Sequence, residues 1–153
     1  MPRTATAHTP DRDALVAFLR QRNRCVLVTY RASGAPQMSP VTYGVDDDGR
    51  VVISTYPSRA KATNLRRTPT ASLCALSDDW NGPYVQVDAQ AEVLDLPEAL
   101  DPLVAYYRSI SGEHPDWDDY RAAMVRQGKC LLRLTITGWG PIATGGFPPG
   151  LAP

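Results

Sequence analysis

Histidine and cysteine are scarce in this sequence, and that scarcity argues against several classes of site. The 153 residues contain only two histidines, and neither His8 nor His114 has a cysteine or carboxylate at metal-ligand spacing. The three cysteines, Cys25, Cys74 and Cys130, are widely spaced within apolar runs. This pattern is typical of free thiols in a reducing compartment and not of a disulfide framework or a Cys-x-x-Cys zinc site. We therefore expect neither a bound metal nor a catalytic triad.

Net charge and long apolar runs are lacking as well. Lys plus Arg equals Asp plus Glu, at 16 each, so the whole chain has no electrostatic attraction for nucleic acid or for an acidic membrane. No apolar run approaches the length of a transmembrane helix. Residues 1–10 form a polar arm without the apolar region of a signal peptide. We expect a cytoplasmic protein folded as one domain over residues 1–153.

Nucleotide-binding and calcium-binding motifs are also absent or incomplete. The run from Gly138 to Ala143 matches a dinucleotide fingerprint only nominally, because Pro141 and the glycines after it prevent the helix that this fingerprint requires. No Gly-x-x-x-x-Gly-Lys-Ser/Thr sequence occurs. The run Asp46-Asp-Asp-Gly49 lacks the later acidic ligands of a calcium loop, and we predict a tight turn there.

Hydrophobic patterning predicts an antiparallel β fold with peripheral helices. β-branched or alternating runs predict six strands, at residues 25–30, 36–45, 50–55, 70–76, 84–94 and 129–137. Helical spacing predicts helices at residues 11–23, 58–69, 97–110 and 117–127. Hairpin-linked strands favour a mainly β (α+β), six-stranded antiparallel barrel over a doubly wound sheet. We expect a second subunit to complete it, and we expect no long regular element in the Gly/Pro-rich tail, residues 138–153.

The most informative stretch runs from Val51 to Pro69, where a buried strand ends and a basic helix begins. The strand ends in Ser54-Thr55, and Ser58 is predicted to be the helix N-cap. Arg59 and Lys61 then fall in the first helical turn, and no acid occurs between Gly49 and Ser77. Helix-end N–H groups and two cations are suited to bind an anion. We predict that this turn holds the phosphate of a cofactor.

These features resemble the pyridoxamine-phosphate-oxidase-like split β-barrel family, and within it the oxidoreductases that use the deazaflavin coenzyme F420. The resembling motifs are Pro36-Gln-Met-Ser-Pro40-Val-Thr, the Ser-Thr strand end, and Arg59-Ala-Lys61-x-x-Asn64-Leu65-x-Arg67-x-Pro69. The resemblance spans residues 11–137. It implies a homodimer with the cofactor in a groove between the protomers.

The resemblance also implies which residues bind the cofactor. The matching residues hold the phosphate at the strand-to-helix turn and line the tricyclic ring along the second strand, while the loop that carries Trp80 reaches the cofactor bound mainly by the other subunit. The implied cofactor-binding residues are Ser39, Pro40, Val41, Thr42, Ser54, Thr55, Arg59, Ala60, Lys61, Asn64 and Trp80.

The implied activity is hydride transfer from reduced F420 to a small electron-poor organic acceptor. No catalytic residue is assigned, and a proton would come from solvent or from a hydroxyl such as that of Tyr43 or Tyr84. One alternative is an FMN enzyme, for example with a pyridoxamine phosphate-like substrate. Another is a non-catalytic carrier or sensor of flavin, deazaflavin or haem. Late in the chain the basic residues are scattered, which favours deazaflavin over a phosphorylated vitamin substrate; they are Arg121, Arg126, Lys129 and Arg133.

Simpler interpretations of the same residues remain open at this point. Arg59 and Lys61 could belong to a solvated helix face, and Ser54 and Thr55 could bond local backbone only. Asn64 could be a helix-surface residue. Trp80 could be an anchor in the core or in a dimer interface. Met38 is expected to fill the core.

Overall fold

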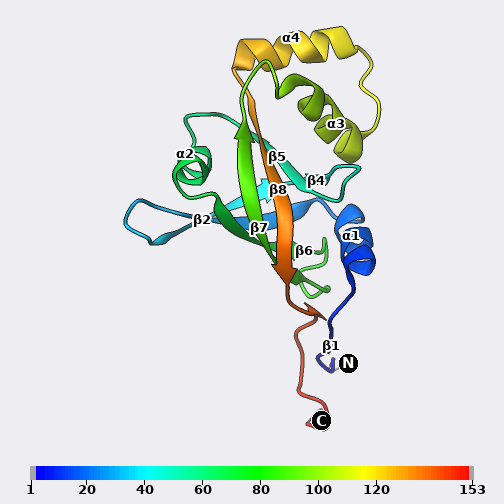
Figure 1. The fold of residues 1–153 in the computed structure, drawn as a ribbon. Helices are drawn as coiled ribbons and strands as arrows, with labels where there is room; N and C mark the ends of the chain where they lie inside the picture. Colours follow the sequence, from blue (N-terminus) through cyan, green and yellow to red (C-terminus); the bar gives the residue numbers. More distant parts are fainter. Residues whose placement is uncertain (1–2, 152–153) are drawn as a thin grey trace.

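The main feature of the fold is a curled sheet with helices at its edges, in a computed structural model that describes residues 3–151 (Figure 1). The strands in this range are β1 (Ala7–His8), β2 (Arg24–Tyr30), β3 (Pro36–Thr42), β4 (Gly44–Val45), β5 (Val51–Thr55), β6 (Thr70–Leu76), β7 (Val85–Leu94), β8 (Cys130–Trp139) and β9 (Ile142–Ala143). The helices are α1 (Arg12–Arg20), α2 (Ala60–Arg67), α3 (Leu100–Ser111) and α4 (Trp117–Gln127). No helix among these residues is long and apolar enough to cross a bilayer.

The main sheet closes on itself through one bent stretch of chain. Its seven strands are paired antiparallel in the order β3-β2-β6-β7-β8-β5-β4. β3 and β4 therefore lie at opposite edges of this order, yet only Tyr43 separates them in the chain. The sheet has to curl until its two edges approach each other, which fits a split barrel.

This closure corrects the prediction of one continuous strand at residues 36–45. Residues 36–42 pair with β2, whereas Gly44 and Val45 pair with β5 on the other edge, so the predicted strand is divided at Tyr43. The seven observed strands thus correspond to the six predicted ones. Tyr43 fixes the corner, because its ring is buried and its hydroxyl donates to the Leu19 carbonyl at 2.9 Å.

Local signals set most of the element ends as expected. The Asp11 carboxylate accepts a hydrogen bond from Ala14 N at 2.8 Å and caps α1, and Gly128 ends α4 with a φ of +62°. The predicted tight turn joins β4 to β5. There the Asp46 carboxylate accepts from the backbone N–H of Arg50 at 2.9 Å, and Gly49 has a φ of +76°.

The two chain ends form a small second sheet, which the prediction of a polar arm and a tail without a long regular element did not include. β8 extends to Trp139, and β9 pairs with β1 in the register Ala7↔Ala143 and His8↔Ile142. The Trp139 indole N–H donates to the Pro10 carbonyl at 2.9 Å. Figure 1 shows β1 and the C-terminal stretch beside it projecting below the barrel. Residues 1–2 of the predicted arm and 152–153 of the predicted tail lie outside the described residues.

β8 holds together two apolar clusters. Cys130, Leu132 and Leu134 belong to the barrel core. Leu131 faces the other side and packs in a second cluster with Leu103 of α3 and Met124 of α4. Consecutive strand residues point to opposite faces, so burial on both faces fixes β8 firmly. The start of this strand is therefore a rigid support for the residues beside it.

Candidate functional site

The strand-to-helix turn after β5 is built as predicted, except for its cap. α2 begins at Ala60 with Arg59 as the N-cap, and no side chain forms a capping hydrogen bond. The prediction of Ser58 as N-cap is therefore wrong, because a turn closed by Arg59 N and the Tyr56 carbonyl at 3.0 Å leaves Ser58 one residue too early. As a result, no side-chain oxygen occupies the first turn of the helix, where an anion would bind.

Two of the predicted cations are joined here by a third that the sequence analysis did not place in the site. Thr55 and Cys130 are partners in the β5–β8 ladder, so the residues just beyond them, Tyr56 and Lys129, lie beside each other. The Lys129 ammonium lies 4.1 Å from the centroid of the Tyr56 ring, and the Arg59 guanidinium carbon lies 5.9 Å from it. The β5–β8 register is the signal that identifies Lys129, and it is not readable from the sequence.

No acid in the described part of the chain neutralises the charges of this turn. Among residues 3–151, no acid lies within salt-bridge distance of Arg59, Lys61 or Lys129. Burial lowers the pKa of Lys61, and the neighbouring Arg59 charge lowers it further. Both effects oppose the charged form of Lys61. An anion bound at the turn would favour the charged form again and would be attracted by it.

Thr55 and Asn64 are more deeply buried than the cations. Ser54 is half-buried, and Thr55 is buried against β8. Asn64 is also buried: its amide nitrogen donates to Thr29 Oγ1 at 3.0 Å, and its oxygen accepts from Arg67 at 3.0 Å. The interpretation of Asn64 as a helix-surface residue is therefore wrong. Ala60 is exposed at the start of α2.

The predicted ring-side strand reaches the same region from the opposite edge of the sheet. Along β3, Pro40 and Thr42 are exposed, whereas Ser39 and Val41 are half-buried. The Tyr106 hydroxyl of α3 donates to the Thr42 carbonyl at 3.2 Å. Burial raises the pKa of this hydroxyl, and a hydrogen bond with the backbone of Ser54 opposes that effect. Tyr106, which the sequence analysis missed, thus links the ends of β3 and β5.

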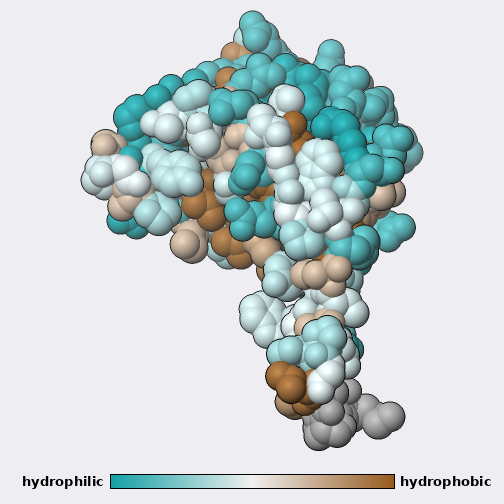
Figure 2. Space-filling view, turned by 60° about the horizontal axis from the view of Figure 1, so that its bottom comes forward, coloured by the Kyte–Doolittle hydropathy of each residue, from teal (hydrophilic) through white to brown (hydrophobic). Residues whose placement is uncertain are grey.

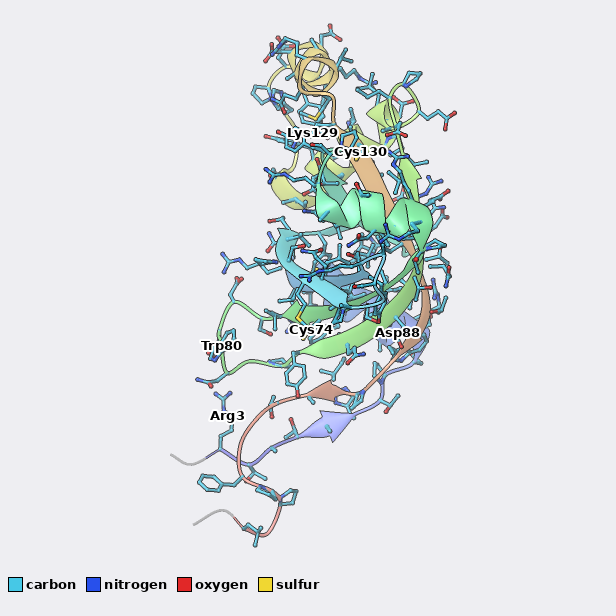
Figure 3. The ribbon with its side chains drawn as sticks, turned by 90° about the vertical axis from the view of Figure 1, so that its left-hand side faces the viewer. Arg3, Cys74, Trp80, Asp88, Lys129 and Cys130 are labelled. Atoms are coloured by element: carbon cyan, nitrogen blue, oxygen red, sulfur yellow. The ribbon has the colours of Figure 1, made fainter. Side chains whose placement is uncertain are left out.

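Trp80 lies apart from the turn in the same chain. Its side chain is 86% exposed, which excludes the core interpretation within one chain. The loop around it is ordered by hydrogen bonds: Arg3 donates to the Asn81 carbonyl at 2.6 Å, and Ser77 donates to the Pro83 carbonyl at 2.5 Å. In Figure 3, Trp80 and Lys129 lie well apart along the molecule. A single protomer therefore does not bring Trp80 to the cations.

Of the two tyrosines considered as proton donors, only Tyr84 is accessible. Tyr43 is fully buried with its hydroxyl bonded to Leu19, and burial raises its pKa, so it is unsuited to the role. Tyr84 is 42% exposed beside β9. The expectation that Met38 fills the core is also wrong, since its side chain is 63% exposed on β3.

A cavity of about 910 Å³ lies between α1, β4 and α3, away from the cations of the turn. None of the predicted cofactor-binding residues lines it, although Tyr106 does. Its charged lining mixes arginines with aspartates, among them Arg20, Arg108, Asp47 and Asp101. Among residues 3–151, no three His, Cys, Asp or Glu side chains are grouped to hold a metal ion. The cysteines in this range are free thiols.

Solved structures share this fold at low sequence identity. The conserved hypothetical protein Rv2991 of Mycobacterium tuberculosis is 22% identical with a TM-score of 0.73, over 88% of this chain and 85% of that one. A protein described as an F420 reductase is 17% identical with a TM-score of 0.61, over 80% and 94%. The haem storage protein HutZ of Vibrio cholerae is 19% identical with a TM-score of 0.65, over 90% and 98%.

A family model gives a more direct assignment. The model described as pyridoxamine 5'-phosphate oxidase matches residues 11–142, which include the curled sheet, the strand-to-helix turn and all four helices. The chain therefore belongs to the pyridoxamine 5'-phosphate oxidase family.

Proposed function

We propose that the protein is a cytoplasmic oxidoreductase that transfers a hydride from reduced coenzyme F420 to a small electron-poor organic acceptor. The observation that carries the proposal is the cation-lined turn between β5 and α2, where Arg59 and Lys61 have no acid partner within residues 3–151. Membership of a flavin-type oxidase family and a similar fold in an F420 reductase support it.

The chemistry of the turn fits a phosphorylated cofactor. Arg59 and Lys61 would hold the phosphate, and the exposed residues of β3, Pro40 and Thr42, would lie along the ring with Ser39 and Val41 beside them. The bound cofactor supplies the hydride, and the protein supplies binding, orientation and exclusion of side reactions. The matching proton would come from solvent or from the exposed hydroxyl of Tyr84.

Two arginines late in the chain favour F420 over an FMN enzyme that acts on a phosphorylated vitamin, because such a substrate would need a second phosphate site. Arg121 is paired with Asp101 at 2.8 Å, and Arg133 is paired with Glu92 at 2.6 Å. These two arginines are therefore neutralised and do not form a second phosphate site. FMN remains the alternative cofactor, because its phosphate would use the same turn.

The second candidate function is non-catalytic: carriage of haem, suggested by similar solved structures that are described as haem proteins. His114 has a structural setting, because its Nδ1 accepts from Asp116 N at 2.9 Å and its ring packs with Tyr107, Trp117 and Tyr120. His8 lies in β1 on the projecting pair of strands. Neither histidine is therefore arranged around the cation-lined turn.

We also propose a homodimer whose interface includes the outer face of β3, β2 and β6. The register places Val28 between Met38 and Ser72, and Val26 between Pro40 and Cys74. Exposed Met38 and Trp80 would then face the partner or its cofactor. In Figure 2, where the bottom of the Figure 1 view is turned toward the reader, apolar residues are exposed at the surface. Sedimentation at micromolar concentration should give a dimer, and Met38→Asp should weaken it; a monomeric wild type would contradict this arrangement.

The functional proposal is tested by titrating the purified protein with F420, FMN and haemin under identical conditions. We expect F420 to bind most tightly, and the reduced F420 complex to be oxidised when a quinone or enone is added. Tighter FMN binding would support the flavin enzyme instead. Tight F420 binding without turnover over a panel of acceptors would support a carrier.

A further inference from the structure

The distribution of cations singles out one place on the surface. Six arginines each form a salt bridge with an acid: Arg24, Arg50, Arg66, Arg108, Arg121 and Arg133. Within residues 3–151, four arginines lack a salt bridge but donate hydrogen bonds to backbone carbonyls or neutral side chains: Arg3, Arg20, Arg22 and Arg67. Arg12, Arg31 and Arg126 have neither kind of partner there, and they lie on three separate segments, α1, the β2–β3 turn and α4. The β5–α2 turn differs, because it brings together three cations that form neither a salt bridge nor a side-chain hydrogen bond within the described residues: Arg59, Lys61 and Lys129.

We propose that Lys129 completes an anion site with Arg59 and Lys61, and that this site takes a ligand with two or more separate anionic groups. The site extends from the start of α2 to the start of β8, beside which Figure 3 shows Lys129 and Cys130. This inference deepens the proposed function, on which it rests only for identifying the ligand as the charged tail of the cofactor.

The Tyr56 ring lies beside two of the three cations. The Lys129 ammonium and the Arg59 guanidinium both lie near this half-buried ring, at 4.1 and 5.9 Å from its centroid. A cation near an aromatic face is attracted by the negative charge density of the ring. Tyr56 therefore acts as a positioning residue that holds Lys129 and Arg59 ready without neutralising either of them.

Lys61 of α2 and Lys129, which directly precedes β8, both lie close enough to the Cys130 thiol to affect its pKa. Both lower the pKa of the Cys130 thiol, although burial, the largest effect, raises it. The nearby acid, Asp95, is already paired with Arg66 at 2.6 Å. The described residues thus supply no unpaired acid beside Cys130.

The charge balance indicates why one phosphate is not sufficient. A phosphate monoester carries about −1.5 to −2 charges near neutral pH, and a diester carries fewer. Arg59, Lys61 and Lys129 together present three positive charges when Lys61 is protonated. A ligand that neutralises all three needs at least one further anionic group, such as a second phosphate or a carboxylate, within reach of Lys129.

The test uses calorimetric titration of the full chain with inorganic phosphate and with tripolyphosphate at low ionic strength. We expect wild type to bind tripolyphosphate more tightly than phosphate. Lys129→Gln should weaken tripolyphosphate binding about tenfold, the loss expected for one charge-assisted contact, and should change phosphate binding about threefold or less. Tyr56→Leu should produce a smaller loss of the same kind, and the control Arg12→Gln should match wild type.

Two results would overturn the inference. One is equal binding of the two probes by wild type, and the other is a Lys129→Gln variant that loses both probes equally or neither. Because the probes contain no ring, this outcome is independent of cofactor choice. A protein that binds neither F420 nor FMN but shows the tripolyphosphate preference would refute the proposed function and leave the extended anion site standing.

Discussion

Replacing Lys61 with alanine is expected to weaken binding of the phosphorylated cofactor about ten- to a hundredfold, because one hydrogen bond to a charged group contributes about 1.5–3 kcal/mol. Lys61 is half-buried next to Arg59 in the first turn of α2, so water replaces it poorly as a partner of the phosphate. Equilibrium titration followed by cofactor fluorescence measures the change. The matched control is Arg12→Ala, which removes a cation of α1 and should leave the affinity unchanged.

The same variant has a second readout in its pH dependence. The pKa of Lys61 is lowered by burial and by Arg59, so Lys61 loses its proton at a lower pH than an ordinary lysine. Cofactor affinity of the wild type should therefore fall as pH rises through this lowered pKa, and Lys61→Ala should lack that part of the decline. If Lys61→Ala binds the cofactor as tightly as the wild type at pH values below this pKa, where Lys61 is charged, Lys61 is not part of the site.

Replacing Asn64 with alanine is expected to destabilise the fold by about 1–3 kcal/mol, the cost of leaving buried hydrogen-bonding groups without a partner. Asn64 joins α2 to β2, because its amide donates to the fully buried Thr29 hydroxyl and its oxygen accepts from Arg67. Urea unfolding measures the loss as a lower midpoint at an unchanged slope.

The Asn64 prediction also separates two roles for this residue. The family resemblance implies a cofactor contact, whereas the observed hydrogen bonds give it a structural task that does not require a ligand. Arg67→Ala serves as the control, because Arg67 is exposed and also donates to the Tyr30 carbonyl. We expect Arg67→Ala to cost less stability than Asn64→Ala. Normal stability of Asn64→Ala together with weaker cofactor binding would contradict the structural role.

Local patterns were sufficient to predict most strands and helices, because their causes lie within a few residues. Alternation over 84–94 and the β-branched run at 51–55 correspond to β7 and β5, and Gly128 ends α4 as expected. Tertiary pairing decided the rest. The bend at Tyr43 depends on which edge each half of the strand joins, and β9 exists because β1 lies alongside it.

The candidate site also contains both kinds of residue, those that local sequence identifies and those that only tertiary pairing brings in. Arg59 and Lys61 were recognised because a strand end, a helix start and a lack of acids are all visible in one stretch of sequence. Lys129 is 68 positions beyond Lys61 in the chain, and only the Thr55↔Cys130 pairing brings it beside Tyr56. Tyr106 was missed for a similar reason, since its contact with Thr42 depends on the packing of α3.

The central claim is that the β5–α2 turn binds the phosphate of the cofactor and takes no part in the chemistry. Its most direct test is a titration of the wild-type protein with F420 and with a phosphate-free form of the same deazaflavin, here called the riboside, in which the side chain ends at the ribityl group. The account predicts that F420 binds at least about tenfold more tightly, and that Lys61→Ala removes most of this difference while leaving riboside binding unchanged. Equal affinity of the wild type for the two ligands would contradict it.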